Sequence, residues 1–142
     1  MRQTNKIVHS WREGIALAIL PGTILLLLHG LFILIGLYDW NVMPWFDIPM
    51  HILGGITVGW GIWSIIQICI AQKKIPRLPV WLIAIAVIGT AAIVGILWEM
   101  YEFVYDRMCH TVLQASLSDT MKDLMDDLIG SVLFALAVVR KK

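Results

Sequence analysis

Charged residues are scarce in this sequence, since Asp, Glu, Lys and Arg make up only 15% of its 142 residues. Soluble domains contain about 25%, and they distribute polar residues around their helices. Here 59% of the residues are hydrophobic, the mean hydropathy is +0.81, and the polar residues gather between long apolar runs. This composition excludes an ordinary soluble domain and predicts one integral membrane domain.

Cysteine and net charge are also low. Cys69 and Cys109 form no CxxC pattern and fall in a predicted span and a predicted loop, so we expect no disulfide between them. The formal net charge of +1 indicates no nucleic-acid partner. We expect no cleavable signal peptide, because the first apolar run is long enough to span a membrane and has no A-x-A-like site.

Four segments are predicted to cross the bilayer as helices, which gives an all-α four-helix membrane bundle. Pro21 predicts a kink or a new helix start in the first segment, whereas Pro49 suits the first turn of the second, with Asp47 as its cap. A basic loop follows the second segment. The predicted spans are 14–38, 49–70, 80–102 and 119–139.

The fourth segment is unusual because its uninterrupted apolar part, 128–139, has only 12 residues. A crossing helix needs about 20, so it must begin near Asp119, after a polar connection over 106–118, with Ser118 or Asp119 as its cap. Asp126 and Asp127 then lie inside the helix. Carboxylates at such depth usually face a protein or water cavity.

Basic residues predict how the helices are oriented. Nine of the eleven Lys and Arg residues lie in the two tails or in the loop between the second and third segments; the exceptions are Arg107 and Lys122. The positive-inside rule then places both termini in the cytoplasm. We therefore expect a multi-pass protein of the inner or plasma membrane whose acidic residues gather near the outer face.

Acidic residues and one histidine recur at helical spacing on three of the four segments. Spacings of three or four residues put such side chains on one helix face, and nearby glycines let helices approach closely. We therefore expect one shared polar site, while His29, mid-span in the first segment, is assigned no chemistry. The candidate site residues are Asp47, His51, Glu99, Glu102, Asp119, Asp123, Asp126 and Asp127.

Carboxylates with one histidine are consistent with a divalent metal site, because oxygen ligands suit Mg²⁺, Mn²⁺ or Ca²⁺ and a histidine adds Zn²⁺. Asp47, His51, Glu99, Glu102, Asp123 and Asp127 are the candidate ligands. Without a cation the acids would repel one another and some would stay protonated, which suits proton transfer. The sequence leaves both alternatives open.

Simpler interpretations exist for some of these residues. Asp47 and Asp119 are suited to helix capping, and Asp123 beside Lys122 is consistent with a solvated pair at the interface. We favour a functional role for Glu99, Asp126 and Asp127 instead, because a charged side chain inside the membrane is energetically costly.

Three groups of residues also resemble a known family. The order Phe46-Asp47-x3-His51-x2-Gly54-Gly55, Trp98-Glu99-x-Tyr101-Glu102 and Asp119-Thr120-x2-Asp123-x3-Asp127-x2-Gly130 is similar to the YjdF-type small bacterial inner-membrane proteins. More distantly it resembles the VanZ-like proteins linked to glycopeptide resistance. The resemblance covers about 47–130 and implies a helical membrane protein with these acids and His51 as its functional set.

Three functions remain open at this point. The first is an enzyme that acts on a lipid or lipid-linked head group, with His51, Glu99, Glu102, Asp123 and Asp127 as the catalytic set. The second is a transporter that binds protons or cations. The third is a non-catalytic assembly subunit. Membrane lipid is the expected partner, and the glycines are also consistent with a homo-oligomer.

Overall fold

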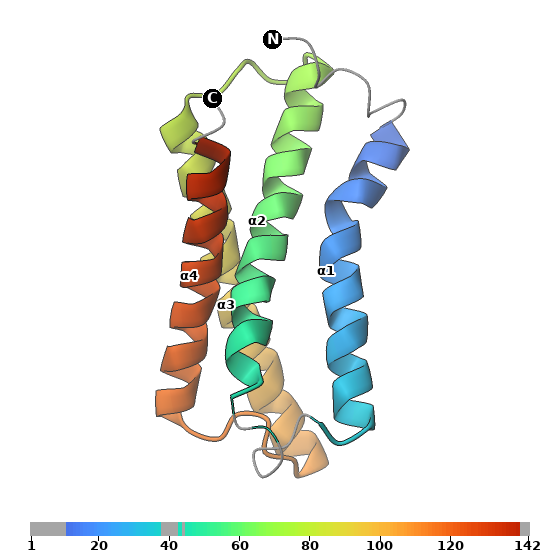
Figure 1. The fold of residues 1–142 in the computed structure, drawn as a ribbon, viewed down its shortest axis with the longest axis vertical. Coiled ribbons are helices and arrows are strands. Elements are labelled where there is room, and N and C mark those ends of the chain that lie inside the picture. Colours follow the sequence, from blue (N-terminus) through green and yellow to red (C-terminus); the bar gives the residue numbers. More distant parts are fainter. Residues whose placement is uncertain (1–10, 38–42, 44, 140–142) are drawn as a thin grey trace.

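Four α-helices, consecutive in the chain, form an antiparallel bundle (Figure 1). The computed structural model describes residues 11–37, 43 and 45–139. The predicted all-α bundle is confirmed. The helices are α1 (Trp11–Leu34), α2 (Asp47–Ala71), α3 (Val80–Cys109) and α4 (Leu117–Val139).

The first two helices differ slightly from their predicted bounds. α1 ends at Leu34 because Gly36 adopts a left-handed conformation (φ 73°), and the N–H of Leu37 donates to the carbonyl oxygen of Phe32 at 2.9 Å. α1 continues through Pro21, so the predicted new helix start is wrong. α2 begins at Asp47 and has Pro49 in its first turn, as predicted.

α3 is longer than predicted and runs to Cys109, which therefore ends a helix and does not lie in a loop. His110 follows in a left-handed conformation (φ 56°). The carboxylate of Asp106 accepts hydrogen bonds from the hydroxyl of Thr111 and the backbone N–H groups of Leu113 and Gln114, at 2.7–2.9 Å. These bonds fold the short connection back onto the end of α3.

α4 also begins differently, because its cap is Ser116. The hydroxyl oxygen of Ser116 accepts a hydrogen bond from the N–H of Asp119 at 3.2 Å, as an N-cap side chain does. The prediction that Ser118 or Asp119 caps this helix is wrong. Asp119 instead lies within the first turn of α4 and is buried in the bundle, with 7% of it exposed.

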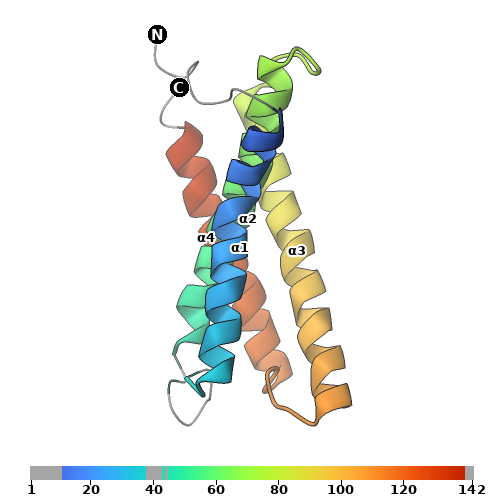
Figure 2. The same ribbon diagram turned by 90° about the vertical axis from the view of Figure 1, so that its right-hand side faces the viewer.

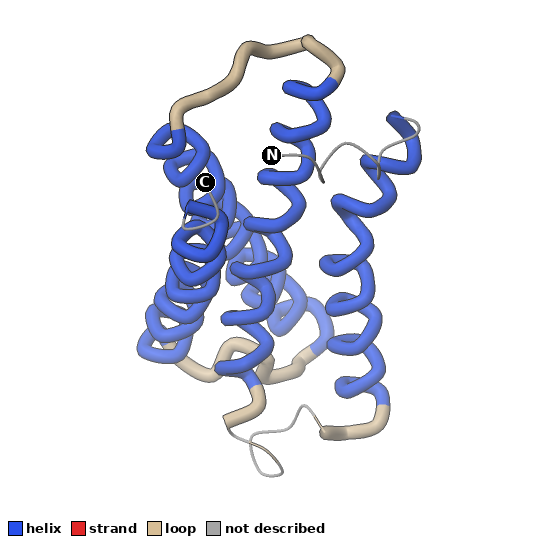
Figure 3. Tube along the Cα trace, turned by 45° about the horizontal axis from the view of Figure 1, so that its top comes forward, coloured by secondary structure: helices blue, strands red, loops and turns tan. Residues whose placement is uncertain are grey.

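The helices do not contribute equally to the bundle. α2 packs against the other three helices and α4 also packs against α3. Within the described residues the backbone of α1 lies close only to α2 (Figures 2 and 3). α2 and α4 approach with little space between their backbones. A Cβ atom on Gly55 would overlap the carbonyl oxygen of Asp127, and one on Gly130 would overlap that of Ile52.

The helix surfaces suit a membrane. α1, α2 and α3 are long and apolar enough to cross a bilayer, and each presents exposed aliphatic side chains on its outer face. α4 has 23 residues, which give about 35 Å of helix. Because of its aspartates it is less apolar than the other three helices and is not among the candidate spans. That α4 crosses the membrane therefore stays a prediction. Residue 11, the connection 72–79 and residue 139 lie at one end of the bundle (Figure 1).

The orientation in the membrane also stays a prediction. Five of the nine basic residues that carry it lie in 1–10 and 140–142, outside the described residues.

The interior of the bundle divides along its length. Towards the end that holds residues 11 and 139, an apolar core is formed by Ile83, Val87 and Ala135, with Phe134 and Trp63 packed against it. The opposite half contains buried polar side chains. Because unpaired polar groups are costly in an apolar interior, the contacts in this polar half indicate where function lies.

Candidate functional site

Buried polar side chains from all four helices gather in the half of the bundle where α2 and α4 begin and α1 and α3 end. Each is at most 9% exposed. The acids of this set belong to α3 and α4, whereas Asp47 of α2 is only partly buried. The set is His29, His51, Glu99, Glu102, Asp119, Asp123, Asp126, Asp127 and Ser131.

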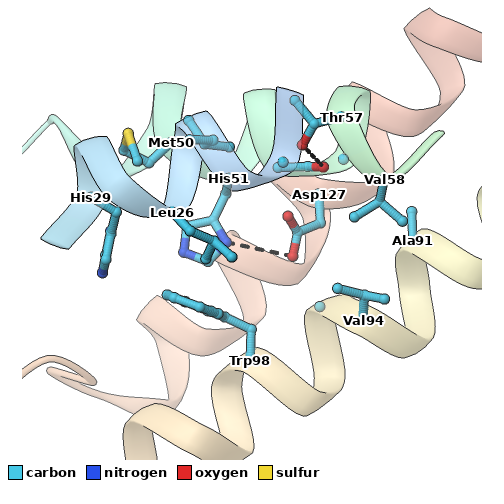
Figure 4. Close-up of a pocket in the computed structure, with 15 residues that line it drawn as sticks. Leu26, His29, Met50, His51, Thr57, Val58, Ala91, Val94, Trp98 and Asp127 are labelled. Carbon is cyan, nitrogen blue, oxygen red and sulfur yellow. Dashed lines mark hydrogen bonds and ion pairs between the residues drawn. The ribbon is translucent and has the colours of Figure 1, made fainter. Parts of the chain in front are cut away.

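His51 lies between carboxylates of two helices. Its Nε2 atom is 3.4 Å from Oδ1 of Asp47, one turn earlier on α2, and its Nδ1 atom is 3.4 Å from Oδ2 of Asp127 on α4 (Figure 4). Asp47 therefore does not cap α2. Phe46 precedes the helix without any side-chain cap bond, and the Asp47 carboxylate is turned towards His51.

This arrangement limits how protons are held. A carboxylate accepts hydrogen bonds and donates none, and a carboxylate oxygen faces each ring nitrogen of His51. The ring therefore donates from both nitrogens as an imidazolium, or a carboxyl group beside it carries a proton. In both cases a proton is shared between α2 and α4, which is what a general acid or base requires.

Glycines make the space for the Asp127 carboxylate. A Cβ atom on Gly95 of α3 would overlap Oδ2 of Asp127, and one on Gly54 of α2 would lie 3.2 Å from its Oδ1. The predicted role of glycine in close helix approach is confirmed at Gly55, which faces the backbone of Asp127, whereas Gly54 and Gly95 make room for its side chain. Substitution of either one would displace the side chain that His51 contacts.

Lys122 is a member of the site that the sequence analysis did not include. Its ammonium nitrogen is 2.8 Å from Asp119, 3.4 Å from Asp123 and 4.0 Å from Asp47. The solvated pair expected for Asp123 is wrong, because Asp123 is only 2% exposed while Lys122 is 35% exposed. The i, i+3 spacing from Asp119 to Lys122 was a signal that could have indicated this contact.

Three residues of this group could hold a metal ion. One ligand atom each from Asp47, His51 and Asp123 lies within 4.8 Å of the other two. That spacing is close to what metal–ligand bonds of about 2.0–2.2 Å require. Oδ2 of Asp126 is buried without a hydrogen bond, whereas Oδ1 of Asp123 is 3.4 Å from the ammonium of Lys122. The ammonium of Lys122 faces two of the same carboxylates.

The two glutamates of α3 form a separate pair with their own partners. The indole N–H of Trp98 donates to Glu102 at 2.9 Å, and the amide of Gln114 donates to Glu99 at 3.1 Å. The six predicted ligands therefore divide into a group on α2 and α4 and a pair on α3. Gln114 was missed because it lies in the connection that Asp106 folds back.

A cavity of about 160 Å³ borders His51 and Asp127 (Figure 4). α1, α2 and α3 form its walls, which are mainly apolar, and the two ionisable side chains form its polar end. The apolar lining includes Leu25, Leu26, Met50, Val58, Ala91 and Val94.

His29 lies at the edge of this cavity. Its ring packs edge-on against Trp98 with ring centroids 5.1 Å apart, and it is 8% exposed. The contact joins α1 to α3. Its sequence neighbours gave no indication of this position, because the aromatic partner is on a different helix.

Long apolar helices around carboxylates, a histidine and a small cavity define a multi-pass membrane protein with an internal polar site. The family described as "Predicted membrane protein (DUF2238)" matches residues 8–142, and the chain belongs to that family. No curated protein and no solved structure matches the chain. The match supports a membrane-protein family, and the narrower YjdF-type and VanZ-like resemblance stays a prediction.

Proposed function

We propose that this protein is a membrane enzyme that acts on the head group of a lipid or lipid-linked molecule. One observation carries the proposal: His51 is buried between Asp47 and Asp127 and borders a cavity with apolar walls. A proton-transfer group next to space for a hydrocarbon chain suits chemistry on an amphiphile. The distribution of basic residues supports an outward-facing site in the inner or plasma membrane, with both termini in the cytoplasm.

The residues have distinct roles in this proposal. His51 transfers the proton, while Asp47 and Asp127 orient its ring and stabilise its charge. The alternative role of His51 is that of a metal ligand. Asp47, His51 and Asp123 would then hold a divalent ion (Mg²⁺, Mn²⁺, Ca²⁺ or Zn²⁺), which would supply Lewis acidity at the head group when bound.

The α3 pair supports the second side of the cavity. Glu102 accepts a hydrogen bond from the indole N–H of Trp98, which lines the cavity, so this carboxylate fixes the orientation of one cavity wall. Glu99 is held by Gln114, and its Oε1 is buried without a hydrogen bond. This pair completes the catalytic set expected from the sequence.

The test is a lipid turnover assay. The purified protein is reconstituted in liposomes made from a total bacterial lipid extract, with EDTA or with each of the four cations, and lipids are followed by mass spectrometry. We expect one lipid class to change mass with the wild-type protein. His51→Gln and Asp127→Asn should lower that rate by at least about 100-fold, the range typical of a lost acid–base group.

Matched controls separate chemistry from folding. His110→Gln and Glu13→Gln make the same changes at exposed positions away from the cavity, and both should keep the wild-type rate. A wild-type protein that changes no lipid under any of these conditions would overturn the proposal. Equal loss of activity in control and site variants would also count against it.

The transporter alternative receives less support from the interior of the bundle. The buried acids lie in one half, and Ile83, Val87 and Ala135 fill the interior of the other half within the described residues. Proton or cation transport needs polar groups through the whole thickness. Cation flux into liposomes that is abolished by Asp127→Asn would favour transport over the enzyme.

A further inference from the structure

The cavity beside His51 has a lateral entrance between α1 and α3. Within the described residues the backbone of α1 lies close to α2 and not to α3. The ring contact between His29 and Trp98 joins α1 to α3 at one edge of the cavity, and the entrance lies beside it. Leu26 of α1 and Val94 of α3 line the cavity, yet they are 57% and 39% exposed. In a bilayer, exposed aliphatic side chains at this depth face acyl chains. The entrance therefore opens towards lipid.

The size of the cavity limits what can enter. Its volume is about 160 Å³, and a dry apolar cavity of roughly 150 Å³ accommodates a molecule the size of benzene. There is space for a short length of hydrocarbon and one small polar group. A complete phospholipid head group would not fit between the apolar walls and the His51–Asp127 pair.

The polar end of the cavity offers a donor beside an acceptor. A hydroxyl group both donates and accepts, whereas a carboxylate or phosphate only accepts and an ammonium only donates. An anionic group would be repelled by Asp127, and a cationic group would meet a ring that already donates to carboxylates. The 3.4 Å separation of His51 and Asp127 exceeds the roughly 2.7–2.9 Å of a charge-assisted hydrogen bond. A hydroxyl oxygen can therefore share the N–H that His51 directs towards Asp127, and the hydroxyl proton can go to another lone pair of the Asp127 carboxylate.

We infer that the cavity binds a long-chain alcohol, whose chain enters between α1 and α3 and whose hydroxyl group accepts from His51 and donates to Asp127. This inference rests on the proposed function, because it assigns the substrate class of the same site. Hydrocarbon chain and hydroxyl group are matched separately, by the apolar walls and by the ionisable pair (Figure 4).

The experiment uses photoreactive probes on the full-length protein in liposomes. Hexadecanol with a diazirine on its chain is compared with hexadecanoic acid and hexadecylamine that carry the same group, all with EDTA so that no bound cation recruits an anion. Crosslinked residues are identified by mass spectrometry. We expect at least about tenfold more label at cavity residues from the alcohol than from the acid, the effect of one mismatched polar group.

Two variants test the entrance and the pairing. Val94→Trp should fill the entrance and abolish cavity labelling, while Ile93→Trp, at a position that is 62% exposed and does not line the cavity, should leave it unchanged. Asp127→Asn removes the negative charge, so labelling by the acid should rise towards that by the alcohol.

Each outcome bears on the inference. Equal labelling by the three probes would overturn the hydroxyl preference, and label spread over the outer faces of the helices would overturn the cavity as the site. Selective alcohol labelling without any lipid turnover would defeat the proposed enzyme and leave alcohol binding standing. Lipid turnover that depends on His51, together with unselective labelling, would defeat alcohol binding and leave the proposed enzyme standing.

Discussion

Nδ1 of His51 lies 3.4 Å from Oδ2 of Asp127, although the two residues belong to different helices and are far apart in the chain. The contact requires a side chain of that length at Asp127 and the lack of one at Gly54 and Gly95. The ionisable pair and the glycines therefore form one structural unit. The predictions below concern the stability, the metal binding and the membrane orientation of this half of the bundle.

The pair should be coupled energetically. Removing one partner of a buried charged pair leaves the other uncompensated, at about 3 kcal/mol or more. His51→Gln and Asp127→Asn should each destabilise the protein, and the double variant should lose less than the sum, by about 0.5–3 kcal/mol. Reversible unfolding in mixed micelles measures this, with Glu13→Gln as the control. Additive losses would contradict the contact.

The close approach of α2 and α4 should make two glycines irreplaceable. Gly55→Ala and Gly130→Ala would push a methyl group onto a facing backbone carbonyl, at about 1–3 kcal/mol each. Gly89→Ala on α3 meets nothing within 4 Å and should change stability by less than about 0.5 kcal/mol. The unfolding free energies of the three variants decide this, and a loss at Gly89 equal to the others would refute it.

Lys122 should compete with divalent cations. Its ammonium lies 3.4 Å from Asp123 and 4.0 Å from Asp47, two of the candidate ligands. Lys122→Met should therefore strengthen Mn²⁺ binding by about tenfold, equivalent to about 1.4 kcal/mol. Arg107→Met removes a basic residue from the same end and should not. Titration calorimetry with both variants gives the answer, and an equal effect in both would rule out local competition.

The polar half should face outward. Alkaline phosphatase inserted in the 110–116 connection should be active, and a fluorescent protein fused after Lys142 should be fluorescent, because the first folds outside the cytoplasm and the second inside. The basic residues near the opposite end are the physical reason. The reversed pattern would invert the proposed orientation.

Features with a regular period were predictable from the sequence. The apolar runs predicted the helices, and spacings of three or four predicted that Asp119, Asp123 and Asp127 share a face of α4. Glycine after His51 predicted close packing, which Gly55 confirms. These features depend on residues near one another in the chain.

Contacts between helices were harder to predict. Asp47 suits an N-cap by sequence, but its carboxylate faces His51 of the same helix and Lys122 of α4. Gln114 reaches Glu99 only because Asp106 folds the connection back. The register between helices determines such contacts, and a single sequence contains no measure of that register.

The backbone of α1 lies close only to α2 within the described residues, and this has a mechanical consequence. When the amino-terminal end is pulled in an atomic force microscope, α1 should leave the membrane first as a separate step, since few contacts resist it. The remaining three helices should come out later and at higher force, because α2 and α4 are closely packed at Gly55 and Gly130 and both pack against α3. We therefore expect α1 to detach as one unit while α2, α3 and α4 stay packed against one another.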